Sequence, residues 1–518
     1  MELADARAGV RLLRRLPAFL RRPISAEEAR AALRERLDRR EADFLTLARR
    51  LVYGHASSPY LPLLRMVGCE YGDLERLVRT EGPEGALDRL AAQGVYLTVD
   101  EFKGRRPIVR GNTRLSPDPR AFTNPLCARD VPGRSGGSRG PSTPVLIALD
   151  YVRECAVDTR LALDARGGGD WLKAYWGVPG VAATVVVLRL SAFGIPVVRW
   201  FSQIDPRAPG LDARYGWSAA GLRWGSRLAG RPLPAPEFVS VEDPRPIARW
   251  MADVLRAGGT PFLQTFPSSA VRVAQAALDA GIDITGTRMT MGGEPTTRAR
   301  LAAIRRAGVD TLARYSSIEC GPIGHGCLNP EAPDEVHLLH DLHLLVPRPG
   351  DDLLVSSLRM SAPLVLFNVS LGDRAVLDRR SCGCPMERLG WTTHLRGIHS
   401  VEKMTAAGMT FLDSDLVRVL EEVLPARFGG GPSDYQLAEE QDADGRPVLR
   451  LLVHPRVGEV AGAAVAETFL SALGAGGGAE HVMGLAWRQA RILSVERGAP
   501  LISPAGKILH LRAGGSRE

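Results

Sequence analysis

Four stretches of the sequence decide the fold class: VLIAL at Val145–Leu149, AATVVVL at Ala182–Leu188, PIARWMADVLRA at Pro246–Ala257 and AVRVAQAALDA at Ala270–Ala280. The first two are short apolar runs, which predict buried strands. The last two space their apolar residues three and four apart, which predicts helices. Strands that alternate with helices indicate an α/β fold with largely parallel sheets.

A different pattern precedes these stretches. Residues 1–90 are rich in Ala, Leu, Arg and Glu, and apolar residues recur at helical spacing, as in Phe44, Leu45, Ala48 and Leu51. This spacing predicts a helical N-terminal region that belongs to a large, multi-sheet domain.

A second change of pattern marks a domain boundary. Regular apolar spacing is lost over about Gly383–Gly397 and resumes with a predicted helix at Asp413–Leu424. We place the boundary near Trp391, which gives a core over residues 91–391 and a small α+β domain over 392–518.

Composition excludes several classes of protein. With 518 residues, 45% of them apolar, the chain is long enough for two or more domains. A net charge of +8 favours anionic ligands. Arginine is spread along the whole length and aromatic residues make up only 6%, so we expect no nucleic-acid partner.

Hydropathy gives no membrane segment. The most apolar stretch, Gly180–Trp200, is interrupted by Arg189, Pro196 and Arg199, and reads as buried strands. The first 22 residues hold six Arg and no apolar core of the length that a secretory signal needs. We therefore expect a cytoplasmic protein without a membrane partner.

A glycine- and serine-rich stretch, Pro132–Pro144, precedes the first predicted strand and cannot form a regular element. Its backbone amides, hydroxyls and guanidinium groups could cradle a polyphosphate. The candidate residues are Ser135, Gly136, Gly137, Ser138, Arg139 and Gly140. Taken alone, such a stretch is more often a linker.

Two further runs offer groups for a nucleotide. The glycine pair of the first run would let a flat ring approach the backbone. In the second run Tyr315 can stack on a base and the Glu319 carboxylate can hold magnesium. The candidates are Gly293, Glu294 and Pro295 in the first run, and Tyr315, Ser316, Ser317 and Glu319 in the second.

Two single residues follow. Asp373 comes after an apolar stretch, Leu364–Phe367, which we interpret as a strand. A carboxylate at a strand end can accept both ribose hydroxyls. Lys507 follows Ser503–Gly506 near the C-terminus, and a lysine on such a loop can reach a phosphate or carboxylate oxygen.

In this order and spacing, the motifs resemble those of the phenylacetate-CoA ligase branch of the adenylate-forming acyl-CoA synthetase superfamily. The resemblance covers roughly residues 60–512. It implies that Ser135–Gly140 is the phosphate loop, that Tyr315 and Glu319 serve adenine and magnesium, that Asp373 serves ribose, and that Lys507 is the catalytic lysine on a mobile C-terminal domain.

The sequence departs from that pattern at three places. Pro141 and Ser142 follow Gly140 where the branch has Lys-Pro, so Arg139 would take over the cationic role. Ile318 stands where threonine is common, which removes one hydroxyl. The hinge segment, Arg396–Lys403, lacks the usual Gly-Arg followed by acidic residues.

The resemblance implies an acid-thiol ligase that uses ATP and Mg²⁺ to turn a small carboxylic acid, favoured by resemblance to be aromatic, into an acyl-adenylate. The acyl group would then pass to coenzyme A. An adenylating enzyme with a different acceptor, namely an amine, a carrier protein or another cofactor, stays open as an alternative, as does a homodimer. A binding protein without turnover is disfavoured because Glu319, Asp373 and Lys507 are all present.

Four residues form a separate candidate site: Cys327, His337, Cys382 and Cys384. Three thiolates and one imidazole suit tetrahedral zinc, and the resembled branch often holds a structural zinc here. The alternative is that these cysteines are small buried apolar residues.

Overall fold

The structure is a computed structural model of residues 1–518, and it describes all of them except 1–2, 128–129, 135–143, 206–212, 350–351, 401–403, 407–408, 412, 442–446, 474–492, 504–505 and 513–518. The chain forms two compact units. The first unit comprises Met1–Ser240, Ala257–Gln264 and Leu312–Ile398, and the second comprises Val241–Arg256, Thr265–Thr311 and His399–Glu518.

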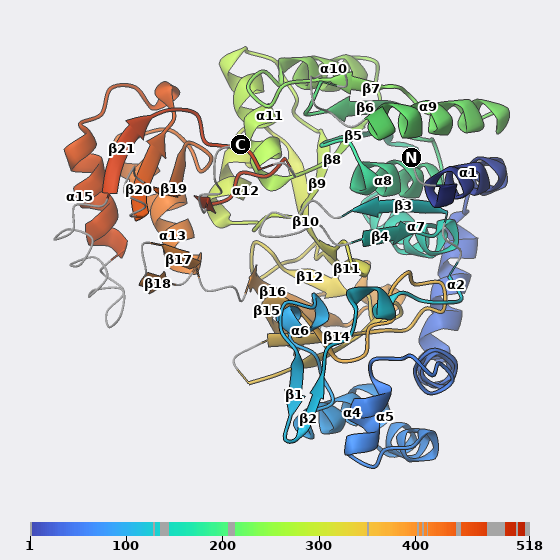
Figure 1. The fold of residues 1–518 in the computed structure, drawn as a ribbon. Coiled ribbons are helices and arrows are strands. Elements are labelled where there is room, and N and C mark those ends of the chain that lie inside the picture. The colour runs from blue at the N-terminus through green and yellow to red at the C-terminus, as the bar shows by residue number, and fades with distance from the viewer. Residues whose placement is uncertain are drawn as a thin grey trace. The chain divides into compact units, whose positions relative to one another are not determined.

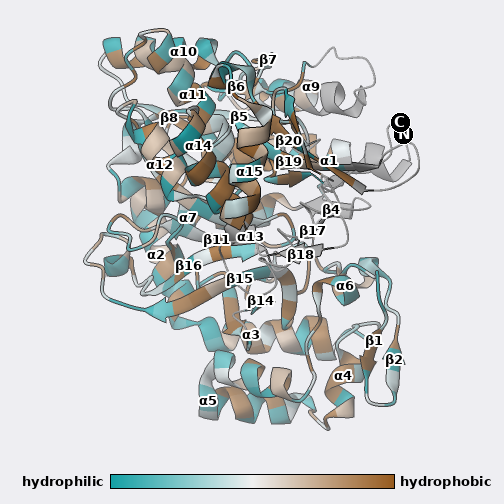
Figure 2. Ribbon diagram, turned by 90° about the vertical axis from the view of Figure 1, so that its left-hand side faces the viewer, coloured by the Kyte–Doolittle hydropathy of each residue, from teal (hydrophilic) through white to brown (hydrophobic). Residues whose placement is uncertain are grey.

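The N-terminal region of the first unit is helical, as predicted. Its helices are α1 (Leu3–Arg21), α2 (Ala26–Asp38), α3 (Arg40–Leu47), α4 (Leu61–Met66), α5 (Tyr71–Ala92) and α6 (Val99–Phe102), with a π-helical segment, η1 (Ala48–Tyr53), after α3. The Ser25 hydroxyl caps α2 and Glu28 returns the bond. In Figure 2 hydrophobic and hydrophilic residues alternate along α5, whose hydrophobic side chains fill a buried cluster.

A parallel group of strands in the first unit runs in the order β8-β5-β6-β7. Its strands are β5 (Leu172–Gly177), β6 (Arg199–Ser202), β7 (Pro236–Phe238) and β8 (Pro261–Thr265), and its helices are α7 (Leu149–Asp164), α8 (Val181–Ser191) and α9 (Ala213–Leu228). Figure 1 shows α8 beside α7 and α1 beside α9. These parallel strands and their helices confirm the α/β class.

An antiparallel group follows in the order β13-β14-β15-β16-β12-β11-β10. Its strands are β10 (Asp310–Ser317), β11 (Gly321–Gly326), β12 (Val336–Leu338), β13 (His343–Pro347), β14 (Asp352–Ser357), β15 (Val369–Arg379) and β16 (Thr393–Ser400). Two hairpins accompany it, β1 (Ile108–Arg110) with β2 (Thr113–Leu115), and β3 (Val131–Arg134) with β4 (Pro144–Ile147). Short 3₁₀ turns lie at Pro119–Phe122, Gly168–Asp170 and Glu387–Leu389.

The second unit carries its own sheet, ordered β21-β20-β19-β22. The strands of this sheet are β19 (Tyr435–Gln441), β20 (Pro447–Val453), β21 (Leu493–Arg497) and β22 (Leu511–Arg512). The unit also contains a separate hairpin, β17 (Met404–Ala406) with β18 (Met409–Phe411), and strand β9 (Arg288–Gly292), which lies outside both of these sheets. Its helices are α10 (Arg245–Arg256), α11 (Pro267–Asp279), α12 (Arg298–Arg305), α13 (Asp413–Arg418), π-helical η5 (Val419–Val423), α14 (Leu424–Phe428) and α15 (Gly462–Leu473), with a 3₁₀ turn at Pro455–Val457.

One division between the two units lies close to the predicted domain boundary, and the others lie within the predicted core. The division after Ile398 lies near Trp391. Val241–Arg256 and Thr265–Thr311, which we assigned to the core, group instead with the C-terminal segment.

Three local predictions were wrong. Ala182–Leu188 lies in helix α8, because an unbroken apolar run fits a buried helix as well as a buried strand. Leu364–Phe367 forms no strand; its Val365 amide donates instead to the Phe122 carbonyl of a distant segment. The stretch Pro132–Pro144 begins with a regular element after all, since β3 extends to Arg134.

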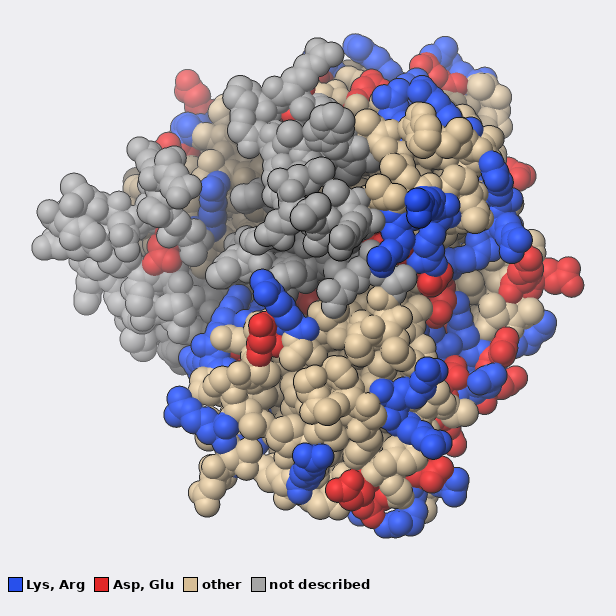
Figure 3. All heavy atoms as spheres, turned by 45° about the vertical axis from the view of Figure 1, so that its right-hand side comes forward, with Lys and Arg blue, Asp and Glu red and all other residues tan. Residues whose placement is uncertain are grey.

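On the face in Figure 3, Lys and Arg lie interspersed with Asp, Glu and uncharged residues. Among the described helices, none combines the length and the apolar character that crossing a membrane would need.

Candidate functional site

The first unit brings Tyr315 and Asp373 together from strands β10 and β15. The Tyr315 hydroxyl donates to Asp373 Oδ2 over 2.8 Å. Burial raises the pKa of Tyr315 and the Asp373 carboxylate raises it further, so the phenol keeps its proton. Gly372 adopts φ +84°, a conformation that favours glycine, immediately before Asp373. Two residues 58 positions apart in sequence are thus one hydrogen-bonded pair.

The end of β10 presents the other predicted residues of this run. The β10–β11 register shifts between Tyr315 and Ser316. Beyond this irregularity the Ser317 hydroxyl donates to the Glu319 carboxylate, and the Glu319 amide donates to Ser317 Oγ over 3.1 Å. Ser317 and Glu319 are both half-buried, so the carboxylate keeps access to solvent. The Ile318 side chain is 37% exposed between them.

The second unit brings Gly293 and Lys507 together. Gly293 follows strand β9 with φ +86°. A Cβ at this position would lie 3.3 Å from the Phe266 ring and 3.5 Å from Lys507 Cε. The backbone angle favours glycine here, and the Phe266 ring leaves little room for a side chain, whereas the Lys507 side chain lies at an ordinary contact distance.

Glu294, next to Gly293, is the centre of a buried hydrogen-bond network. Its carboxylate accepts the Ser268 hydroxyl at 2.8 Å, the Ser268 amide at 2.9 Å and the Ile508 amide at 3.1 Å. Arg300 Nη1 donates to it over 2.8 Å. The Ile508 bond ties the residue after Lys507 to the glycine-rich run, so Glu294 helps to position that lysine.

Arg300 extends this network to Glu421 in η5 and to His510, which immediately precedes the C-terminal strand β22. Its Nε lies 2.7 Å from Glu421 Oε1, and His510 Nε2 lies 2.6 Å from the same oxygen. Thr297 Oγ1 also donates to Glu421. The Arg300 and Glu421 side chains are 1% and 0% exposed. The sequence did not predict the roles of Thr297, Arg300, Glu421 and His510. Arginine is frequent along the chain, and no local pattern distinguishes the one arginine that is buried in this network.

The predicted phosphate loop lies outside the described residues. This applies to Ser135, Gly136, Gly137, Ser138, Arg139 and Gly140. The strands that flank it, β3 and β4, pair antiparallel from Val131↔Ile147 to Arg134↔Pro144. Pro295, the remaining predicted residue, accepts a hydrogen bond from Arg300 through its carbonyl.

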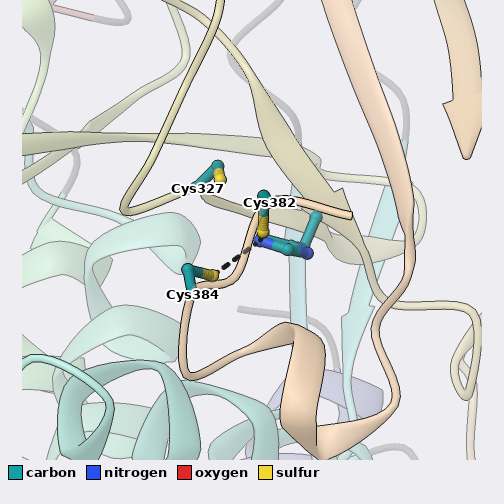
Figure 4. Close-up of side chains that lie close together, drawn as sticks. Cys327, Cys382 and Cys384 are labelled. Carbon is teal, nitrogen blue, oxygen red and sulfur yellow. Dashed lines mark hydrogen bonds between the residues drawn. The ribbon is translucent and has the colours of Figure 1, made fainter. Parts of the chain in front are cut away.

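The predicted cysteine and histidine cluster is assembled in the first unit (Figure 4). The ligand atoms of Cys327, His337, Cys382 and Cys384 all lie within 4.8 Å of one another. His337 Nε2 lies 3.1 Å from Cys384 Sγ and 3.6 Å from Cys382 Sγ. All but Cys382 are buried. Three sulfurs and one imidazole nitrogen thus converge at one point, which is the donor set that zinc prefers.

The surroundings of His337 also suit a metal. Its other nitrogen, Nδ1, lies 2.6 Å from the Trp391 carbonyl, and a proton held there leaves Nε2 as the donor toward the sulfurs. The Cys327 thiol and the His337 ring lower the pKa of Cys384, which favours its thiolate.

A second group adjoins the cluster and was not predicted. It contains Glu335 and His394, and shares Cys327. His394 Nδ1 lies 2.7 Å from Glu335 Oε1, and Arg380 pairs with the same carboxylate. Glu335 thus has a cationic partner, Arg380, within the protein, while burial lowers the pKa of His394 and favours its neutral form.

Comparison with known proteins gives likeness in structure only. No protein-family model matches the sequence, and no curated protein matches it significantly. Solved structures of 2-hydroxyisobutyryl-CoA ligase in the postadenylation state, one in complex with R3-HIB-AMP and one with 2-HIB-AMP, each match with a TM-score of 0.52 and 15% identity. Each match covers 95% of this chain and 90% of the ligase. The chain therefore has the fold of this acyl-CoA ligase, as the motifs predicted.

Proposed function

We propose that the protein activates a carboxylic acid with ATP as an acyl-adenylate and transfers the acyl group to the thiol of coenzyme A. The observation that carries this proposal is that the Lys507 side chain lies beside Gly293, although these two motif residues are distant in sequence. The Tyr315–Asp373 pair and a fold similar to that of 2-hydroxyisobutyryl-CoA ligase support it.

In the first step the carboxylate attacks the α-phosphorus of ATP, and the bond to pyrophosphate breaks. Negative charge accumulates on the departing oxygens, so the site must supply cations. We assign this role to Lys507 and Arg139. Tyr315 would contact adenine and Asp373 the ribose, while Ser316, Ser317 and the predicted loop would contact phosphate.

The carboxylate of Glu319 would hold Mg²⁺, which supplies charge neutralisation beside the phosphates. Its donor chemistry fits this role, since a half-buried carboxylate with a neighbouring hydroxyl offers hard oxygen ligands. Glu294 is different: its oxygens already accept four hydrogen bonds within the protein.

For the second step we propose that the C-terminal domain turns about a hinge near Gly397 and withdraws Lys507. Gly397 adopts φ +64°, and one limit between the two compact units follows at Ile398. Large backbone changes are usually absorbed at a few residues of this kind.

We further propose a structural zinc ion bound by Cys327, His337, Cys382 and Cys384. With four protein ligands the site would be closed, so the metal would tie β11 and β12 to the segment before β16 and take no part in catalysis. Such a site supports the finer resemblance to the phenylacetate-CoA ligase branch.

A pyrophosphate-release screen tests the proposed activity. Aryl, aryl-acetic and aliphatic acids are supplied with ATP and magnesium, first without and then with coenzyme A. Acid-dependent pyrophosphate release, followed by AMP release only on addition of coenzyme A, is the expected result. AMP release that depends on an amine or a carrier protein would favour the other acceptor class, and no release with any acid would refute adenylation.

A further inference from the structure

Two guanidinium groups are buried together in the first unit. Arg189 lies on helix α8 and is 2% exposed, and Arg314 lies on strand β10 and is 9% exposed. Arg189 Nη2 donates to Gln264 Oε1 of strand β8 over 3.1 Å. Burial raises the pKa of Tyr175 on strand β5, and the charges of Arg189 and Arg314 oppose that rise. Helix α8 and strand β10 thus each bury one guanidinium group in the first unit, and we refer to Arg189 and Arg314 together as the cationic cluster.

The charge of this cluster is not balanced within the described part of the chain. The Nε atoms of both arginines are buried and have no hydrogen-bond partner there. Burial lowers the pKa of Arg314 and the neighbouring Arg189 lowers it further, while only Cys155 and Tyr175 oppose this. Asp158 is the one carboxylate that acts on Arg189, and only through its charge. Buried charges are normally paired, so two buried guanidinium groups whose Nε atoms have no partner among the described residues call for an anion.

The cluster adjoins the residues that we assign to the nucleotide. Arg314 directly precedes Tyr315, and its Nη1 donates to Ser316 Oγ over 3.4 Å. The guanidinium thus points along β10 toward Ser316. A group bound by Arg314 would lie next to the acyl-adenylate rather than at a remote surface.

We propose that Arg189 and Arg314 bind a second carboxylate on the acyl substrate, so that the enzyme activates dicarboxylic acids. One carboxylate reacts with ATP, and the other forms charge-assisted hydrogen bonds with the guanidinium groups. An acid without the second carboxylate would leave both cations buried and unpaired, and would be rejected for that reason. This inference rests on the proposed function, whose general form does not depend on it.

The experiment compares acids that differ only in the distal group. Pyrophosphate release is measured for a four- to six-carbon dicarboxylate, for its half-ester and for the monocarboxylate of equal length. We expect kcat/KM for the dicarboxylate to exceed the other two by about tenfold or more. Equal or better use of the monocarboxylates would overturn the inference while leaving adenylation intact.

Variants identify the residues. Arg314→Met should lose about tenfold or more on the dicarboxylate, mainly through KM, and should gain or keep activity on the monocarboxylate. Arg314→Lys should retain part of the preference for the dicarboxylate. If the Arg314 variants do not fold, the same comparison of acids with Arg189→Met tests the site independently. Arg199→Met, an exposed arginine on β6, is the control. Equal loss on all acids would show that Arg314 serves the reacting carboxylate instead.

A binding measurement keeps the two proposals separate. Without ATP, the dicarboxylate should raise the thermal midpoint of the parent protein and not of Arg314→Met, and the monocarboxylate should raise neither. Stabilisation of the parent without pyrophosphate release would refute the proposed function but not the anion site. Absence of stabilisation by any dicarboxylate, together with absent preference in turnover, would refute the anion site.

Discussion

The proposed chemistry depends on single residues, and a substitution of Glu319 tests it at the magnesium site. Glu319→Gln keeps the shape of the side chain but removes the charge that would hold magnesium. We expect a loss of about a hundredfold or more in pyrophosphate release. Glu237→Gln, on exposed strand β7, is the control. Unchanged turnover of the Glu319 variant at low magnesium would remove this residue from the site.

The cysteine cluster makes a prediction about metal content. After dialysis against a chelator, the parent protein should retain about one equivalent of zinc, because closed thiolate sites release zinc slowly. Cys384→Ser should retain much less, whereas Cys69→Ser, a buried cysteine outside the cluster, should match the parent. Less than about a tenth of an equivalent in the parent would exclude the site.

Residue types and spacing predicted the partners of this cluster, since four metal-ligating residues stand out in any sequence. They also singled out Tyr315, Asp373, Gly293 and Lys507. They could not show that Tyr315 bonds to Asp373, because that contact depends on the strand order. Nor could they show that Arg189 and Arg314 are both buried, because their burial depends on the packing of α8 and β10.

At the scale of elements, the network around Arg300 joins α12, η5 and the segment just before the C-terminal strand β22. Arg300→Leu would leave Glu294 and Glu421 buried without their cation. We expect this change to destabilise the protein by about 3 kcal/mol or more, measured by urea unfolding. Arg298→Leu on the same helix, at an exposed position, should change little. A shift below about 0.5 kcal/mol for Arg300→Leu would show that the network contributes little.

The same network predicts a dependence of stability on pH. Burial alone would raise the pKa of Glu421, but Arg300, His510 and Thr297 together lower it below its ordinary value. Its stabilising contribution is therefore complete above the unfolded value, about 4.3, and is lost as pH falls through the lower folded pKa. The thermal midpoint of the parent should fall more steeply than that of Glu421→Gln below this pH. Parallel curves would contradict the assignment.

Elements differed from prediction where burial hides periodicity. The helices α10 and α11 were predicted correctly because one face of each is polar or small. Helix α8 was mistaken for a strand because eight of its eleven residues are buried and no polar face marks the turn. The segment Leu364–Phe367 was mistaken for a strand because its apolar residues are buried in irregular backbone, where Leu366 is 0% exposed.

At the scale of the whole molecule, the two units divide the proposed reaction between them. The first holds Tyr315, Asp373 and Glu319, and the second holds Gly293 and Lys507. The motifs predicted this fold because all five occur in the chain in the same order as in the resembled family. The assignment of Thr265–Thr311 to the second unit was not predictable, since it follows from packing rather than from a break in the sequence.

The central claim is that Lys507 serves adenylate formation and then leaves, so the decisive measurement follows the two half-reactions separately in Lys507→Ala. Adenylate formation should slow by about a hundredfold or more with ATP affinity nearly unchanged, because the lysine meets charge that develops only in the transition state. Transfer to coenzyme A, started from pre-formed acyl-adenylate, should stay within about tenfold of the parent. Lys103→Ala, a lysine at the end of α6, should leave both steps unchanged. Equal slowing of both half-reactions in Lys507→Ala, or of neither, would contradict the two-step account.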